Sequence, residues 1–119
     1  MKVCVPTNGS GGLGDHVCEH FGRAPTFTVV DTDSDSVTVV PNTSEHMGGI
    51  GAPPEHIART GSKVLVCSGL GRKAIGMFEG FGIEVFVGAR GTVQDAIQLW
   101  QQGKLERASD INACKEHGH

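Results

Sequence analysis

The sequence predicts an α/β fold with a single mixed five-stranded sheet in the order 3-2-1-4-5, with strand 2 antiparallel and helices on both faces. Three observations predict it. Short runs rich in valine are typical of strands, the later segments between them carry apolar residues at helical spacing, and glycine or proline marks the junctions. At 119 residues, the chain has the length of one ordinary domain.

The first part of the chain favours strands, and the second part alternates strand with helix. The expected strands span residues 2–6, 26–31, 36–40, 64–67 and 83–87. The expected helices span residues 53–60, 69–79 and 92–102. Thr92 and Asp95 form a capping-box variant at the start of the last helix. We expect the core of the sheet to contain Val3, Val5, Val64, Val66, Val85 and Val87.

The two ends of the chain differ in character. Residues 1–103 are expected to form the α/β domain that contains the binding site, because all the strand and helix patterns lie there. Residues 104–119 are mostly polar and have few apolar side chains to pack. We expect them to form a C-terminal tail that is mobile from about Asn112.

The composition argues against several function classes. A net charge of −3, and one tryptophan with no tyrosine, argue against nucleic-acid binding. There is no stretch of 18 apolar residues, so no membrane span is expected. The apolar N-terminal run is too short for a signal peptide, and we therefore expect a cytoplasmic protein. No GxxxxGK[ST] motif is present, so no nucleotide cofactor is expected.

Glycine is unusually frequent, at 18 residues, and its positions point to one edge of the predicted sheet. In the predicted topology, the loops after strands 1, 3, 4 and 5 leave the sheet at the edge where open α/β sheets bind ligands. Twelve of the 18 glycines fall in those loops, and Arg23, Arg72, Lys73 and Arg90 lie on the same rim. Backbone amides, helix N-termini and basic side chains together predict an anion site there.

Several histidines and cysteines are also spaced so that they could bind a metal ion. His16, Cys18 and His20 alternate, so in an extended segment they face one way and form a candidate metal site. The alternative is that they are ordinary surface and packing residues. Imidazole and thiolate groups elsewhere add further candidate ligands, and in the tail they could wrap one divalent ion. These further candidates are His46, Cys114, His117 and His119.

One longer run is distinctive. Residues 20–25, His-Phe-Gly-Arg-Ala-Pro, followed by the strand 26–31, resemble the N-terminal signature of the nitrogenase iron–molybdenum cofactor accessory family. The similarity continues in residues 48–51, 67–74 and 81–86 and covers roughly residues 1–103. The resemblance implies a ribonuclease H-like topology. It also implies relatives that bind metal–sulfur clusters, including orange-protein-like members with a molybdenum–copper cluster.

The resemblance implies a non-catalytic carrier for a metal–sulfur cluster of Mo/Fe/S or Mo/Cu/S type, which it exchanges with donor and acceptor proteins. A sulfide cluster is a multiply charged anion, and backbone amides and arginine can hold it without covalent ligation. The expected cluster-binding residues are Asn8, Gly9, Gly11, Gly12, His20, Phe21, Gly22, Arg23, Gly48, Gly49, Gly51, Ser68, Gly69, Gly71 and Arg72.

Other function classes stay open. One is a small regulatory or nucleotide-binding domain, and another is a simple zinc-, nickel- or copper-handling protein. A ribonuclease H-like nuclease is disfavoured, because the strands at 2–6 and 64–67 carry no carboxylate to hold two metal ions. The sequence leaves the native cluster and the oligomeric state open.

Overall fold

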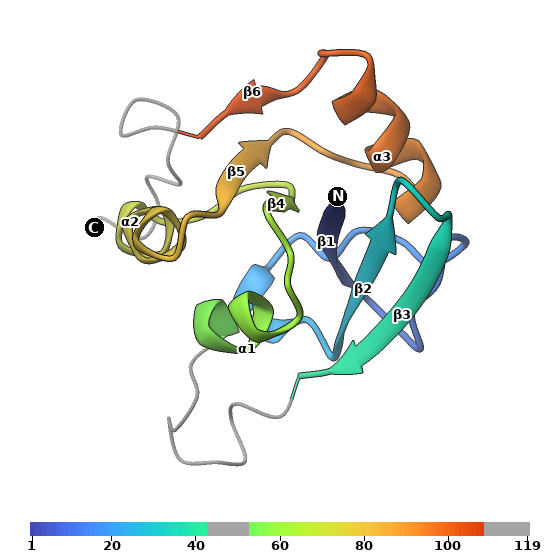
Figure 1. The fold of residues 1–119 in the computed structure, drawn as a ribbon, viewed down its shortest axis with the longest axis horizontal. Helices are drawn as coiled ribbons and strands as arrows, with labels where there is room; N and C mark the ends of the chain where they lie inside the picture. Colours follow the sequence, from blue (N-terminus) through green and yellow to red (C-terminus); the bar gives the residue numbers. More distant parts are fainter. Residues whose placement is uncertain (43–52, 109–119) are drawn as a thin grey trace.

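One mixed sheet organises the computed structural model, which describes residues 1–42 and 53–108 (Figure 1). The strands are β1 (Lys2–Thr7), β2 (Thr26–Asp31), β3 (Ser36–Pro41), β4 (Val64–Val66), β5 (Glu84–Val87) and β6 (Glu106–Arg107). Their order is β3-β2-β1-β4-β5-β6. β2 is antiparallel to both β1 and β3, whereas β1, β4 and β5 are parallel. The predicted order of the first five strands is confirmed.

The prediction of five strands is wrong by one, because β6 adds an antiparallel strand beside β5. Arg107 lies opposite Phe86, and the guanidinium of Arg107 pairs with the Glu84 carboxylate at 3.2 Å. The amide of Ala108 donates to the carbonyl oxygen of Val85 at 2.7 Å, and Ala108 is buried. A strand of two charged residues has no alternation of apolar and polar residues, so no sequence pattern marks it.

Helices cover both faces of the sheet, as predicted (Figure 1). Helices α1 (Pro53–Arg59) and α2 (Arg72–Gly80) pack Ile57, Ile75 and Phe78 against one face. Helix α3 (Val93–Gln101) packs Val93, Ala96 and Ile97 against the other. A short 3-10 helix, η1 (Phe21–Arg23), interrupts the loop after β1. None of the helices in the described residues is long and apolar enough to cross a membrane.

Valine fills the centre of the sheet, because β-branched side chains pack well on a pleated surface. Successive residues of β1 and β4 face opposite helix layers, so these strands are apolar on both sides. All six valines predicted for the core are buried: Val3, Val5, Val64, Val66, Val85 and Val87.

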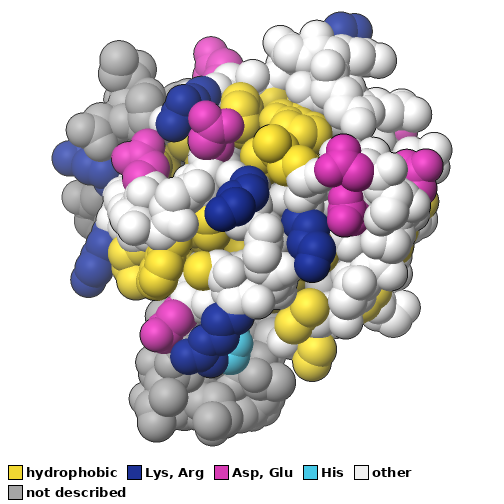
Figure 2. All heavy atoms as spheres, in the orientation of Figure 1, with side chains coloured by type: hydrophobic (Ala, Val, Ile, Leu, Met, Phe, Trp, Pro, Cys, Tyr) yellow, Lys and Arg dark blue, Asp and Glu magenta, His cyan; other side chains and the backbone are white. Residues whose placement is uncertain are grey.

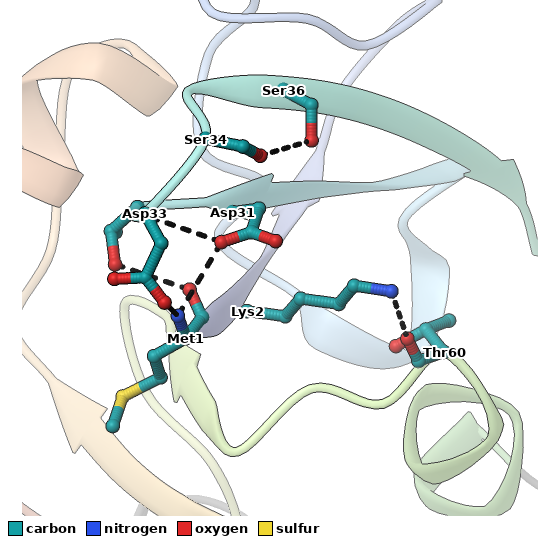
Figure 3. A network of polar contacts seen from close by, with 8 residues as sticks. Met1, Lys2, Asp31, Asp33, Ser34, Ser36 and Thr60 are labelled. Atoms are coloured by element: carbon teal, nitrogen blue, oxygen red, sulfur yellow. Dashed lines mark hydrogen bonds and ion pairs between the residues drawn. The ribbon is translucent and has the colours of Figure 1, made fainter.

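Local charge pairs tie down the amino end of β1 (Figure 3). The Met1 ammonium donates to the carboxylates of Asp31 and Asp33, across the turn between β2 and β3. The Asp33 backbone amide also donates to Asp31, and this hydrogen bond is the main reason that the pKa of Asp31 is lowered. The acidic turn between β2 and β3 therefore lies at the amino end of β1, and the glycine-rich loops lie at the opposite end of the strands.

Candidate functional site

The loop after β1 doubles back and runs beside the loop after β5. Val17 forms an isolated bridge with Thr7, and His16 forms one with Thr92. The Val17 amide donates to the Gly91 carbonyl oxygen at 2.9 Å. These contacts bring the loops after β1 and β5 together at the carboxyl edge of the sheet, where the sequence places the site.

A side-chain hydrogen bond joins the loops after β4 and β5. The Ser68 hydroxyl donates to the Ala89 carbonyl oxygen at 2.8 Å, and the Gly88 amide donates to the Ser68 carbonyl oxygen at 3.0 Å. Ser68, in the loop after β4, therefore joins that loop to the loop after β5. Backbone groups of Gly88 and Ala89, just after β5, hold Ser68 in place.

A pocket of about 370 Å³ opens between these three loops. It offers a guanidinium, two imidazoles, an amide and a hydroxyl, against one carboxylate. That donor set suits an anion better than a cation. The lining residues are Asn8, His16, Val17, Cys18, Glu19, His20, Ser68, Arg90 and Gly91.

The structure brings part of the predicted metal triplet to this pocket but does not converge it into a ligand set. Cys18 is buried in the core beside the pocket, and its thiol donates to the His20 carbonyl oxygen at 3.3 Å. His16 and His20 are exposed. In residues 1–42 and 53–108, no three His, Cys, Asp or Glu side chains are grouped to hold a metal ion. The histidines are therefore placed as hydrogen-bond donors at the rim.

The amides of the first glycine-rich loop already have an acceptor within the chain. The Asp15 carboxylate accepts from the amides of Gly9 and Gly11 at 2.8 Å each, and from its neighbour His16 at 2.7 Å. Partial burial opposes the charge of Asp15, but these amide bonds and the nearby imidazole outweigh it, so its pKa is lowered. Asp15 occupies the place that an external anion would take in such a nest of amides.

Two glycines of this loop have conformational reasons to be there. Gly11 and Gly12 have φ angles of 86° and 102°, and the Gly12 amide donates to the Thr28 hydroxyl at 3.0 Å. A Cβ on Gly11 would lie 2.6 Å from Cγ1 of Val39. The glycine content here follows from backbone path and close approach.

The two helix N-termini at this edge differ. The α3 terminus is satisfied within the chain, because the Asp15 and Leu13 carbonyl oxygens accept from the amides of Val93 and Gln94. Thr92 and Asp95 add the predicted capping box. The α2 terminus begins at Arg72, and its N-cap Gly71 has no side chain to cap the first amides. Without a side-chain cap at Gly71, the partial positive charge of this helix end favours an anion nearby.

The other predicted cluster-binding residues have various surroundings. Phe21 is buried, with its ring centroid 5.4 Å from that of Phe27 and 5.5 Å from that of Phe78, so it packs the core beneath the site. Gly22 and Arg23 are exposed in η1, outside the pocket lining. Gly69, Gly71 and Arg72 lie where β4 leads into α2. Outside the described residues lie His46, Gly48, Gly49, Gly51, Cys114, His117 and His119.

Four lining residues were not among the predicted binding residues: Val17, Glu19, Arg90 and Gly91. Arg90 was expected on the rim, but Arg23 was the predicted binding residue. The family-like run at 20–25 drew attention to Arg23, whereas the bridge of His16 with Thr92 brings the Arg90 loop to the pocket. That pairing has no local signal in the sequence.

The fold and this pocket define a small α/β domain with hydrogen-bond donors gathered at the carboxyl edge of its sheet. Residues 1–103 match the model of the dinitrogenase iron-molybdenum cofactor family, and the chain belongs to that family. It is similar to the apo form of the orange protein of Desulfovibrio gigas, with a TM-score of 0.81 and 30% identity. That alignment covers 91% of this chain and 92% of the orange protein.

Two further relatives extend the similarity. A Thermotoga protein assigned to NifB, known by NMR, is 30% identical with a TM-score of 0.73, over 89% of this chain and 91% of that one. An uncharacterized protein of Methanocaldococcus jannaschii is 27% identical over 112 residues, which are 90% of this chain and 91% of the relative. Full-length matches of this kind confirm the family that residues 20–25 suggested.

Proposed function

We propose that this chain is a non-catalytic carrier that holds an anionic metal–sulfur cluster in the pocket at the carboxyl edge of the sheet. The single observation that carries the proposal is the donor-rich pocket between the loops of β1, β4 and β5, in a chain of the iron–molybdenum cofactor family. The cluster is cargo, of Mo/Fe/S or Mo/Cu/S type.

The chemistry of the pocket supports hydrogen bonding to the cluster rather than a full set of metal ligands. Arg90 presents several N–H donors in a fixed fork, which suits the multiple sulfur acceptors of a polyanion. His16 and His20 add ring N–H donors, and Asn8 adds an amide. Hydrogen bonds of this kind break without cleavage of a covalent bond. A carrier needs such reversible contacts in order to release its cargo. The uncapped N-terminus of α2 adds a favourable field nearby.

In this proposal, His16, Cys18 and His20 do not together ligate one metal ion. Cys18 would have to leave the core before its sulfur could ligate a metal together with His16 and His20. We therefore assign the two histidines to anion binding. Cys18 lines the pocket but keeps its thiol in the core, hydrogen-bonded to the His20 carbonyl oxygen, so we assign it a packing role in the described arrangement.

The wider role follows from the cargo. A chain that binds a preassembled cluster reversibly must take it from a donor protein and give it to an acceptor, and in our proposal this happens in the cytoplasm. The undescribed glycines at 48–51 and the Cys114–His119 tail stay within this proposal as additional cluster contacts.

The test uses the full apo chain without oxygen. Tetrathiomolybdate is titrated with and without Cu(I), and bound molybdenum and copper are measured by visible absorption and elemental analysis after desalting. Wild-type chain is expected to retain coloured cluster at a fixed stoichiometry. Arg90→Ala is expected to weaken retention by roughly tenfold to a hundredfold, the range for one charged hydrogen bond.

Arg59→Ala is the matched control, because Arg59 is also an exposed arginine, at the end of α1 and outside the pocket lining. It should bind as the wild type does. Equal retention by Arg90→Ala and wild type would place the site elsewhere. Stoichiometric zinc or nickel with no coloured cluster would favour the simple metal-handling alternative.

A further inference from the structure

The two edge strands of the sheet, β3 and β6, differ in how well they are protected against pairing with a strand of another molecule. β6 is two residues long, both of them charged, and Arg107 pairs with Glu84 on β5. β3 is six residues long, Ser36–Pro41, and contains no charged residue. Short, charged edges resist pairing with other strands, whereas long uncharged edges invite it.

The hydrogen-bond ladder shows which groups of β3 point outward. The Asn42 amide donates to the Pro25 carbonyl oxygen at 2.9 Å, and Pro41, opposite Thr26, has no amide hydrogen to give. In an antiparallel ladder, hydrogen-bonded pairs alternate with non-hydrogen-bonded pairs. Ser36, Thr38 and Val40 therefore bond to β2. The N–H and C=O groups of Val37 and Val39 face away from the sheet.

The side chains at the same two positions are also exposed. Val37 is 38% exposed and Val39 is 39% exposed, and alternation along the strand puts them on one face. Val39 is held in place by Gly11, which approaches its side chain so closely that a Cβ there would clash. The edge therefore presents outward backbone groups and fixed apolar side chains together.

We propose that β3 is a dimer interface in which a second copy of this chain adds its β3 antiparallel, with Thr38 opposite the same residue of the partner. In this register Val37 of each copy pairs with Val39 of the other, so both residues use their outward N–H and C=O groups. The four valines meet on one face, and the two threonines meet on the other. The sheet then continues across the two-fold axis.

Charge and symmetry favour a second copy over other occupants. The pairing residues carry no charge, so two copies meet without like-charge contact. An antiparallel edge pairing is isologous and closes as a dimer. An open filament would need the opposite edge to take part, and the short charged β6 blocks that. The axis is perpendicular to the sheet, so the two carboxyl-edge pockets lie at opposite ends and stay open.

The ladder is bounded at both ends, which fixes its register. Pro41 lacks an amide hydrogen, and Asp35, with φ of 61°, donates its amide to the Asp31 carbonyl oxygen inside the turn. Neither can extend the pairing. An interface this short is a weak one, so dimerisation should depend on concentration in the micromolar range or above.

The first test is sedimentation equilibrium of the full apo chain over a concentration series. We expect a monomer–dimer equilibrium, with a dissociation constant raised about tenfold or more by Val37→Lys, because two desolvated charges would face the partner edge. Met77→Lys is the matched control, since Met77 is 40% exposed on α2 and loses a similar apolar side chain for the same charge. It should dimerise as wild type.

The second test checks the register by cross-linking in a Cys114→Ser background. Thr38→Cys should form an intermolecular disulfide under mild oxidation, because the two residues form a non-hydrogen-bonded pair on the axis. Ser36→Cys, which is offset from its own copy, should cross-link at least about tenfold more slowly. A wild-type chain that stays monomeric at millimolar concentration, or equal dimerisation by Val37→Lys, would overturn the proposal. Neither result bears on cluster binding.

Discussion

Two glycine-rich loops follow parallel strands at the same edge of the sheet, and they differ in how their amides are satisfied. In the loop after β1, the Asp15 carboxylate accepts from the amides of Gly9 and Gly11. The backbone carbonyl oxygen of Asp15 accepts from the first amide of α3. In the loop after β4, Gly71 offers no cap to α2, and the next two residues are basic. The first loop therefore contains its own anion, whereas the described residues give the second loop no side-chain cap.

Glycine content is therefore an ambiguous signal for anion binding. Glycine permits both a tight internal path and an exposed backbone. Whether the amides are available depends on acceptors elsewhere in the fold, such as the Asp15 carboxylate and the Thr28 hydroxyl. The chain's anion site should therefore lie toward β4 and β5, near Ser68 and Arg90, rather than over Gly9 and Gly11.

The largest expected effect comes from Gly11→Val in the closed loop. The substitution forces a β-branched residue to a φ of 86° and drives its Cβ into Val39. Strain and overpacking together should lower the free energy of unfolding by about 3 kcal/mol. Chemical denaturation measures the change.

Gly14→Val provides the control within the same loop. Gly14 has no positive φ, and a Cβ there meets nothing within 4 Å. Its effect should stay within about 0.5 kcal/mol. Equal destabilisation by both variants would mean that close packing of Gly11 does not hold this loop.

Thr92→Ala tests the satisfied helix N-terminus. Thr92 accepts from the Asp95 amide at 3.1 Å and completes the capping box with the Asp95 carboxylate. Removing the hydroxyl should lower the free energy of unfolding by about 1 kcal/mol, as for other N-caps. A loss below measurement error would show that the loop carbonyl oxygens alone satisfy the helix end.

Asp15→Asn tests the internal anion through pH. The pKa of Asp15 is lower in the folded chain than in the unfolded chain, so its contribution is complete at neutral pH. It is lost as the pH falls from about 4 through the lowered pKa. The variant should have a shallower acid slope of stability than wild type, by less than about 1 kcal/mol because Asp15 is largely solvated. Identical slopes would contradict the role of Asp15.

The smallest expected effect on stability comes from Lys73→Glu in the open loop. A carboxylate in the first turn of α2 should stabilise the helix by a few tenths of a kcal/mol, up to about 1 kcal/mol. The same change should weaken thiomolybdate binding, because it replaces a positive charge beside the proposed anion site with a negative one. Lys63→Glu, before β4, alters the net charge equally and should leave binding unchanged.

The fold was largely readable from the sequence because the strands are strongly patterned. The order of the first five strands and the six core valines followed from valine runs and crossover rules. β6 was missed because Glu106 and Arg107 carry no apolar alternation. The start of α2 was placed three residues early, because Gly69 and Gly71 mark a turn as readily as a helix start.

Only part of the candidate site could be predicted from the sequence. Topology alone brought Asn8, His16, His20 and Ser68 to one edge. It could not predict that the thiol of Cys18 would turn to the core, since alternation holds only for a straight extended segment. Nor could it predict that Asp15 would reach back to Gly9 and Gly11, because that contact depends on the path of the loop in three dimensions.

The difference between the two loops is tested most directly by a titration of backbone amide NMR signals with tetrathiomolybdate and Cu(I), without oxygen. The largest shifts are expected at Asn8, Ser68 and Gly91 and at the first amides of α2. The amides of Gly9 and Gly11 should stay protected from hydrogen exchange by Asp15 and move little. The largest shifts at Gly9 and Gly11, with loss of their protection, would contradict this expectation, because the cluster would then have displaced the internal anion.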